Sequence, residues 1–181
     1  MRALLTRSCP LLIQLNVLLT LLLWCGQSWG LNLRVESVAG VYIGEELLLL
    51  QQRIGQPEKR SPELYDQQDR CKVQVLFYER IGVEVEVCER DGVRRVRSLR
   101  ATDDSVAKTS YQCRVGDSVA KLRAAYPMLS DTGGGVWSIE DRQHQITLSF
   151  FIEDEHIVEI SLMRHPGANG GTRLQRRRAY R

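Results

Sequence analysis

Hydrophobic and polar residues alternate strictly in several short stretches of this chain. Val83, Val85 and Val87 alternate with Glu84 and Glu86, and the same period recurs in the C-terminal half. A period of two places apolar side chains on one face of a β-strand and polar side chains on the other. The pattern predicts strands, separated by turn residues, over residues 71–78, 83–88, 93–99, 136–140, 145–151 and 157–163.

Two other stretches have helical spacing and match each other. Around Gly44 and Gly116 the chain reads IGEELLLL and VGDSVAKL. In each stretch a glycine precedes an acidic residue. A carboxylate at the start of a helix stabilises the helix, because it interacts with the unpaired N–H groups there. Apolar residues follow at positions i, i+3 and i+7, and a glycine or proline ends each helix. The matched pattern predicts a structural repeat.

Each predicted helix is followed by one group of predicted strands. The sequence therefore predicts an α+β fold of two tandem units, each a helix followed by a three-stranded antiparallel meander. The predicted units span residues 31–102 and 103–163, and they form a sheet with helices on one face. We expect the opposite face to bear these side chains: Gln74, Leu76, Tyr78, Glu84, Glu86, Thr147, Ser149, Phe151 and Glu159.

This opposite face is the predicted docking surface for a protein partner. Aromatic residues dominate the binding energy of many interfaces, so they are favoured as anchors. Trp137 is also compatible with a core position. The predicted partner-binding residues are Tyr65, Leu76, Tyr78, Glu84, Glu86, Trp137 and Phe151.

The repeated motif of an apolar residue, a glycine, an acidic residue and a helix, followed by a meander, resembles the beta-lactamase inhibitory protein fold. It is also similar to the small lipoprotein of the outer-membrane assembly machinery, the BamE family, which has a single copy. The resemblance covers most of residues 37–163. It implies a helix-on-sheet binding module of the bacterial cell envelope, without catalysis. An inhibitor of an envelope or secreted hydrolase is the alternative within binding modules.

Residues 1–30 have the features of a secretory signal peptide. Two arginines precede an apolar run at residues 11–24, and small residues occupy positions −3 and −1 of a cleavage site after Gly30. The run is short for a membrane span. A retained anchor helix and a lipoprotein modified at Cys25 are the alternatives to cleavage after Gly30. We expect an exported protein that is periplasmic or secreted.

The charge is unevenly distributed along the chain. Residues 31–163 contain all 22 acidic residues, whereas residues 164–181 contain six arginines and no acidic residue. We expect residues 164–181 to be a disordered basic tail, which can contact anionic lipid or only aid solubility. The arginines of residues 94–100 lack the interleaved aromatic residues on which bases stack, so we expect no nucleic-acid partner. We expect these arginines to form ion pairs across the sheet with Glu84 and Glu86.

Three cysteines remain after removal of the predicted signal peptide. Alternation predicts that Cys71 and Cys113 point inward and that Cys88 points outward. A disulfide between Cys71 and Cys113 is therefore preferred to one between Cys71 and Cys88, and three free thiols are the alternative. Their spacing does not match a zinc site.

Two groups of residues offer an enzymatic alternative, a hydrolase. Asp131 lies in Asp-Thr-Gly, the tripeptide of aspartic proteases, whose mechanism needs two carboxylates that share a proton. His144 and His156 lie in predicted turns among carboxylates and are candidate metal ligands. A flexible connector and solvated turns are the favoured interpretations, so we expect neither catalysis nor a metal or other cofactor.

Overall fold

The computed structural model describes residues 32–102 and 105–165, which belong to one unit, Asn32–Arg181. Strands predominate and two α-helices accompany them, so the predicted α+β class is confirmed. The elements are β1 (Ser37–Val38), β2 (Val41–Tyr42), α2 (Leu47–Ile54), β3 (Lys59–Arg60), β4 (Leu64–Asp66), β5 (Cys71–Tyr78), η1 (Glu79–Ile81), β6 (Val83–Arg90), β7 (Val93–Ala101), α3 (Val119–Ala125), β8 (Ser130–Asp131), β9 (Val136–Asp141), β10 (Ile146–Glu153) and β11 (His156–Arg164).

The predicted signal peptide, residues 1–30, lies outside the described residues. The predicted basic tail comprises residues 164–181, and its residues 166–181 lie outside the described residues as well. Its first residue, Arg164, is the last residue of β11. No helix among the described residues has both the length and the apolar composition needed to cross a bilayer.

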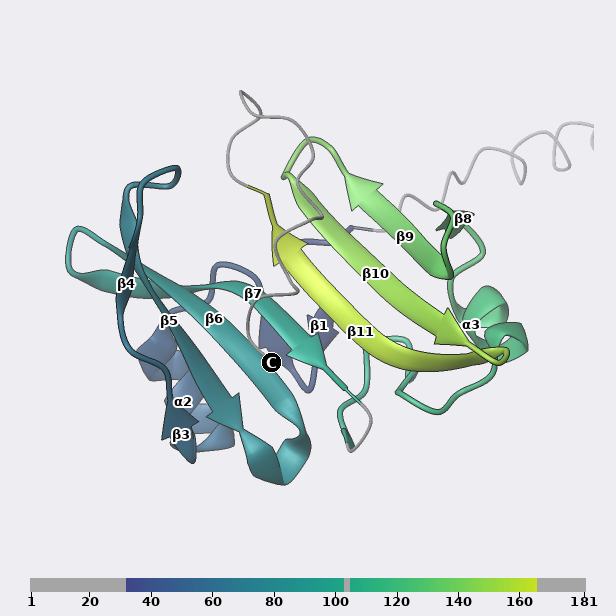
Figure 1. Cartoon of the computed structure of the whole chain (residues 1–181), viewed down its shortest axis with the longest axis horizontal. Helices are drawn as coiled ribbons and strands as arrows, with labels where there is room; N and C mark the ends of the chain where they lie inside the picture. The colour runs from purple at the N-terminus through teal and green to yellow at the C-terminus, as the bar shows by residue number, and fades with distance from the viewer. Residues whose placement is uncertain (1–31, 103–104, 166–181) are drawn as a thin grey trace, which may run out of the picture. The chain divides into compact units, whose positions relative to one another are not determined.

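Nine strands of the described residues form one antiparallel sheet (Figure 1). Its order is β3-β5-β6-β7-β11-β10-β9-β8, and β4 also pairs with β5. Strands β7 and β11 join the N-terminal group of strands to the C-terminal group, with Leu99 opposite Leu162. The two segments that the sequence predicts as separate units therefore share one sheet.

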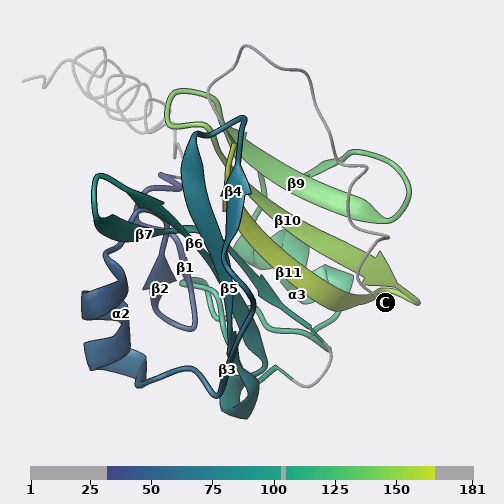
Figure 2. The ribbon, with the colours of Figure 1, turned by 60° about the vertical axis from the view of Figure 1, so that its left-hand side comes forward.

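One face of this sheet forms the hydrophobic core. A row of buried side chains crosses five strands through Leu76, Val85, Leu99, Leu162 and Leu148, each paired with the next. Helices α2 and α3 lie on the same side of the sheet (Figures 1 and 2). Each helix buries residues at positions i and i+3, and each leucine so buried contributes about 2 kcal/mol of transfer free energy. The buried helix residues are Leu47, Leu50, Val119 and Leu122.

Both helices begin at a pair of backbone hydrogen bonds to the sheet. The N–H of Gly44 donates to the carbonyl of Val96 at 2.8 Å, and the N–H of Val96 donates to the carbonyl of Glu45 at 2.8 Å. Gly44 has φ +83°, a region that disfavours any side chain, which explains the glycine before the helix. The same pair of bonds precedes α3, at 2.7 and 2.9 Å, between Gly116, Asp117 and Ile157.

The predicted orientation of β5 is wrong. Leu76 and Tyr78 are buried, with 0% and 2% of their surface exposed, whereas Val73, Val75 and Phe77 point to the other face and are half-buried. Both alternate sets of side chains in β5 contain apolar residues, so periodicity alone does not decide which set faces the core. Pairing with β6 decides it, because β6 has only one apolar side.

The disulfide also differs from the prediction. Cys71 is bonded to Cys88, and Cys113 is a buried free thiol, so the predicted Cys71–Cys113 bridge is wrong. The corrected orientation of β5 places Cys71 and Cys88 on the same face of neighbouring strands, with their Cα atoms 5.8 Å apart. The inward orientation of Cys113 is confirmed, and burial raises the pKa of its thiol to about 11.

Reduction of the Cys71–Cys88 disulfide should lower the free energy of unfolding by about 3 kcal/mol. The bond joins cysteines that are 17 positions apart, and it restricts the unfolded chain accordingly. Urea unfolding of residues 31–181, with and without reductant, measures the change. Reductant should still lower the free energy of unfolding of the Cys113→Ser variant, which keeps the disulfide. It should not lower that of the Cys88→Ser variant, which lacks it. A reductant effect that persisted in Cys88→Ser would contradict the assignment.

Candidate functional site

The face of the sheet that points away from α2 and α3, here called the outer face, carries polar and charged side chains. A second row of paired residues crosses it through Glu84, Arg100, Ser161, Ser149 and Ser138. This row runs parallel to the leucine-rich row of the core on the opposite side. The sheet therefore has one apolar and one polar face, as the alternation in β6 and β10 predicts.

Arg97 lies on the outer face at a β-bulge of β7. Val96 pairs with Val87, and Ser98 pairs with Glu86, so Arg97 is the extra residue between two ladder positions. A bulge bends its strand and redirects the side chain at that point. Here it directs a guanidinium group toward β6 and toward the chain that follows β4.

The guanidinium of Arg97 lies among three carboxylates. Its nitrogens are 2.8 Å from an oxygen of Asp66, 3.0 Å from one of Asp69 and 3.4 Å from one of Glu86, and the Arg97 side chain is 21% exposed. Burial raises the pKa of Asp66, but hydrogen bonds from Arg97 and from backbone N–H groups outweigh it and hold that pKa below its usual value. The cluster thus has more carboxylates than guanidinium groups.

Arg100 forms a second, adjoining cluster on the same face. It is 2.7 Å from a carboxylate oxygen of Glu159 and 3.8 Å from one of Glu84. The predicted ion pairs with Glu84 and Glu86 are confirmed for Arg97 and Arg100. They are wrong for Arg94, which pairs with Glu63 and Glu89, and for Arg95, which pairs with Glu46. We call these seven charged residues the acidic centre of the outer face: Asp66, Asp69, Glu84, Glu86, Arg97, Arg100 and Glu159.

An apolar strip borders the acidic centre. Val73, Val75 and Phe77 lie side by side on the outer face of β5, opposite Cys88, Glu86 and Glu84 of β6. Each of the three strip residues is half-buried. The outer face therefore combines carboxylates with a strip of apolar surface.

The structure places only some of the predicted partner-binding residues on this face. Glu84, Glu86 and Phe151 lie on it and are half-buried. Leu76 and Tyr78 are in the core and cannot reach a partner docked there, so that part of the prediction is wrong.

The two other predicted aromatic anchors lie elsewhere. Trp137 pairs with Phe150 and therefore faces the core side, where the guanidinium of Arg123 is 4.4 Å from the centroid of its ring. Tyr65, on the short strand β4, is 64% exposed and pairs with Lys72, which also points away from the outer face.

Asp131, from the hydrolase alternative, serves a turn. Its side chain is exposed, and its carboxylate accepts a hydrogen bond of 2.8 Å from the N–H of Gly133. Thr132 donates from its hydroxyl to the carbonyl of Val136 in the same turn. These bonds hold the turn between β8 and β9, so Asp131 ends a short paired strand and does not lie in the flexible connector that the sequence predicts.

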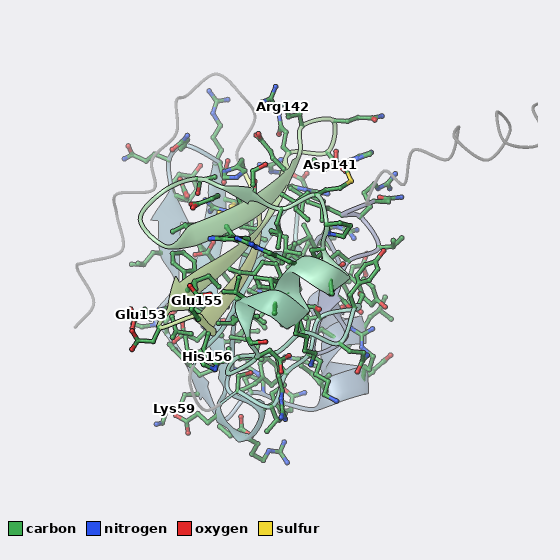
Figure 3. All side chains as sticks on the ribbon, turned by 90° about the vertical axis from the view of Figure 1, so that its right-hand side faces the viewer. Lys59, Asp141, Arg142, Glu153, Glu155 and His156 are labelled. Carbon is green, nitrogen blue, oxygen red and sulfur yellow. A yellow bond between two sulfur atoms is a disulfide. The ribbon has the colours of Figure 1, made fainter. Side chains whose placement is uncertain are left out.

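His144 and His156 lie at opposite ends of β10 and do not meet. His144 is 2.8 Å from a carboxylate oxygen of Asp141, and His156 is 2.7 Å from the carbonyl oxygen of Asp154. The 8 residues of β10 span roughly 26 Å. Figure 3 shows Asp141 and His156 well apart. Within residues 32–102 and 105–165, no three His, Cys, Asp or Glu side chains are grouped to hold a metal ion.

Sequence reasoning missed a buried carboxylate, Glu36. Its side chain is 1% exposed, and one oxygen accepts hydrogen bonds from the N–H of Ser110 at 2.9 Å, the N–H of Ser37 at 3.2 Å and the hydroxyl of Tyr126 at 3.3 Å. Burial raises the pKa of Glu36, and these hydrogen bonds only partly offset the effect. Glu36 lies in an irregular segment without period or motif, so no sequence signal points to it.

An open groove of about 560 Å³ lies beside this carboxylate. The groove is lined by β1 and the β1–β2 turn, by Ile54 and Ile81, and by residues 106–110 and Gln112. Its side-chain polar groups include the hydroxyls of Ser37 and Ser110, which are 3.0 Å apart. The bonds of Glu36 tie the N-terminal segment to the loop before α3, which is a structural role.

Comparisons with known proteins assign no function. No protein-family model and no curated protein sequence matches the chain. A solved structure of a cysteine-rich secretory protein from Staphylococcus aureus is similar, with 13% sequence identity and a TM-score of 0.39. The similarity covers 67% of this chain and 44% of that one, so the chain spans less than half of the length of the structure it matches.

Replacement of Arg97 by alanine should lower the free energy of unfolding by about 2 kcal/mol, because three partly buried carboxylates lose their cation. Arg95→Ala is the matched control, since Arg95 makes an exposed ion pair with Glu46 and should cost less than about 1 kcal/mol. Urea unfolding near neutral pH measures both. Equal losses for the two variants would contradict a special role for Arg97.

The Glu36→Gln variant should gain stability relative to the natural chain as the pH rises. Because burial raises the pKa of Glu36, the folded state holds its proton more tightly than the unfolded state. The natural chain therefore loses stability as the pH rises above the ordinary value for glutamate, about 4.3, and glutamine has no proton to lose. Urea unfolding across that range measures the difference, with the exposed Glu155→Gln as control. A difference that shrank with rising pH would refute this account.

Proposed function

We propose that this chain is an exported, non-catalytic protein-binding module of the bacterial cell envelope, which binds a basic segment of a partner protein on its outer face. The excess of carboxylates in the acidic centre is the observation that carries this proposal. Five carboxylates surround two guanidinium groups there, and all of these groups except Asp69 are on strands of the sheet.

A basic segment fits this surface for electrostatic and geometric reasons. Complementary charge speeds encounter and disfavours acidic partners. Arginine side chains bind carboxylates through paired N–H groups, and the carboxylates of Glu84 and Glu86 stand on alternate positions of one strand. The apolar strip of Val73, Val75 and Phe77 adds surface whose burial favours association.

The disulfide supports the proposal of export. Bonds such as Cys71–Cys88 persist in oxidising compartments and are rare in the reducing cytosol. The apolar N-terminal run and the small residues before the proposed cleavage site after Gly30 support the same location.

We also propose that the fold consists of two related helix-plus-meander units. Supporting evidence comes from the backbone, since both helices begin with the same pair of hydrogen bonds to the last strand of their group, at Val96 and at Ile157. In both strands the next residue is the extra residue of a bulge, Arg97 in β7 and Val158 in β11. In this view the acidic centre developed around the bulge residue of the first unit, Arg97, whereas the bulge residue of the second unit is Val158.

A labelled peptide of nine arginines tests the proposed function. Residues 31–172 should bind it, because this chain keeps the outer face and lacks the arginines of residues 173–181, which would compete. Fluorescence anisotropy at low salt should show binding that weakens in about 0.5 M salt, where charges are screened beyond about 4 Å.

The double variant Glu84→Gln/Glu86→Gln should weaken this binding about tenfold, a loss of about 1.4 kcal/mol. The control is Glu153→Gln/Glu155→Gln, which makes the same change of charge at the exposed turn between β10 and β11 (Figure 3). If the two double variants bound the peptide equally well, the outer face would not be the binding surface.

A further inference from the structure

We propose that the C-terminal residues 173–181, RLQRRRAYR, dock on the acidic centre of their own chain and compete there with the basic segment of a partner. This inference rests on the surface that carries the proposed function and adds its regulation.

The chain leaves the fold on the outer face. The last strand, β11, ends at Arg164, and the imidazole of His165 lies 2.8 Å from the hydroxyl of Thr147. Thr147 pairs with Met163 and belongs to the outer face, together with its strand neighbour Ser149. The side chain of His165 is therefore on the outer face.

The exit is also level with the cluster around Arg97 along the strands. Met163 is directly opposite Ser98 on the antiparallel strand β7, and this register places Arg164 level with Arg97. Residues 44–46 occupy the edge of β7 at that level, and His165 keeps a backbone hydrogen bond to Gln145, on the β10 side. Ser98 is paired in turn with Glu86, which places a carboxylate of the acidic centre two strands from the exit.

The linking segment is long enough to reach the acidic centre. Neighbouring strands are about 4.8 Å apart, so β6 lies roughly 10 Å from β11 across the sheet. Residues 166–172 read PGANGGT, and a glycine-rich segment of this length has a root-mean-square span of about 15 Å. The arginines that follow can therefore reach Glu86, Asp66 and Asp69 without disturbing the strand pairing.

The charges are complementary. Residues 173–181 contain arginines at positions 173, 176, 177, 178 and 181 and no acidic residue. The acidic centre has five carboxylates and two guanidinium groups, so it keeps a net negative charge. A tethered segment acts at a millimolar effective concentration, which lets even weak ion pairs occupy the surface.

Binding of the nine-arginine peptide to three chains tests the inference. The first two chains are residues 31–181 and residues 31–172. The third is a variant of residues 31–181 in which the arginines at positions 173, 176, 177 and 178 are replaced by glutamine. The truncated chain and the glutamine variant should bind the peptide at least tenfold more tightly than residues 31–181. A variant with lysine at the same four positions keeps the charge and should behave like the natural chain. Equal affinities for residues 31–181 and 31–172 would overturn the inference.

Amide chemical shifts provide a measurement that does not depend on the peptide. Residues 31–181 and 31–172 should differ at outer-face positions such as Ser98, Glu86 and Met163, and the differences should not depend on protein concentration. Differences that grew with concentration would assign the contact to a second copy and overturn the intramolecular form. If residues 31–172 did not bind the peptide but the chemical-shift differences on the outer face were present, the proposed binding of a partner would be wrong and the docking of residues 173–181 would stand.

The anionic surface of a lipid bilayer is the rival ligand for the same arginines. Vesicles of phosphatidylglycerol and phosphatidylcholine should bind residues 31–181 no better than residues 31–172 if the arginines are engaged with the acidic centre. Tight vesicle binding that is lost on truncation, without shift differences on the outer face, would assign the segment to lipid and overturn the inference.

Discussion

The pairing of β7 with β11 is the interaction on which the rest of the structure depends. These strands join two groups that are otherwise built from consecutive segments, and they place Leu99 opposite Leu162 in the middle of the core. The same register aligns Arg100 with Ser161 on the outer face. A shift of one residue would exchange the two faces of one group relative to the other. The continuous core and the polar row both follow from this one alignment.

The bulge in β7 gives the outer face its charge pattern. The extra residue puts Arg97 and Ser98 on the same face, near Glu86, and returns Leu99 to the core. Asp66 at the end of β4 and Asp69 in the loop that follows it reach the same guanidinium. A local irregularity of the backbone thus assembles a cluster from three separate segments.

The sequence predicted the parts of the fold in which only one arrangement satisfies the pattern. Strand β6 has a single apolar side, and the glycine before each helix is needed for its positive φ. Strand β5 has apolar residues on both sides, so its orientation depends on pairing that the sequence does not show, and the disulfide error followed from it. Asp66 and Asp69 lie in a polar loop that resembles any solvated loop until Arg97 is placed beside it. Glu36 is likewise recognised only from the segments that enclose it.

Partial neutralisation explains how an acidic surface can be both stable and available for binding. Five unpaired carboxylates at such short range would repel one another and weaken the sheet, since like charges on neighbouring strands are destabilising. Full pairing would leave no net field to attract a cation. Arg97 and Arg100 each contact more than one carboxylate, which holds the side chains in place while the negative charge remains in excess. In the proposed function and its proposed regulation, arginines from a partner or from residues 173–181 would complete the neutralisation, and because both would use the same carboxylates, the binding of one would exclude the other.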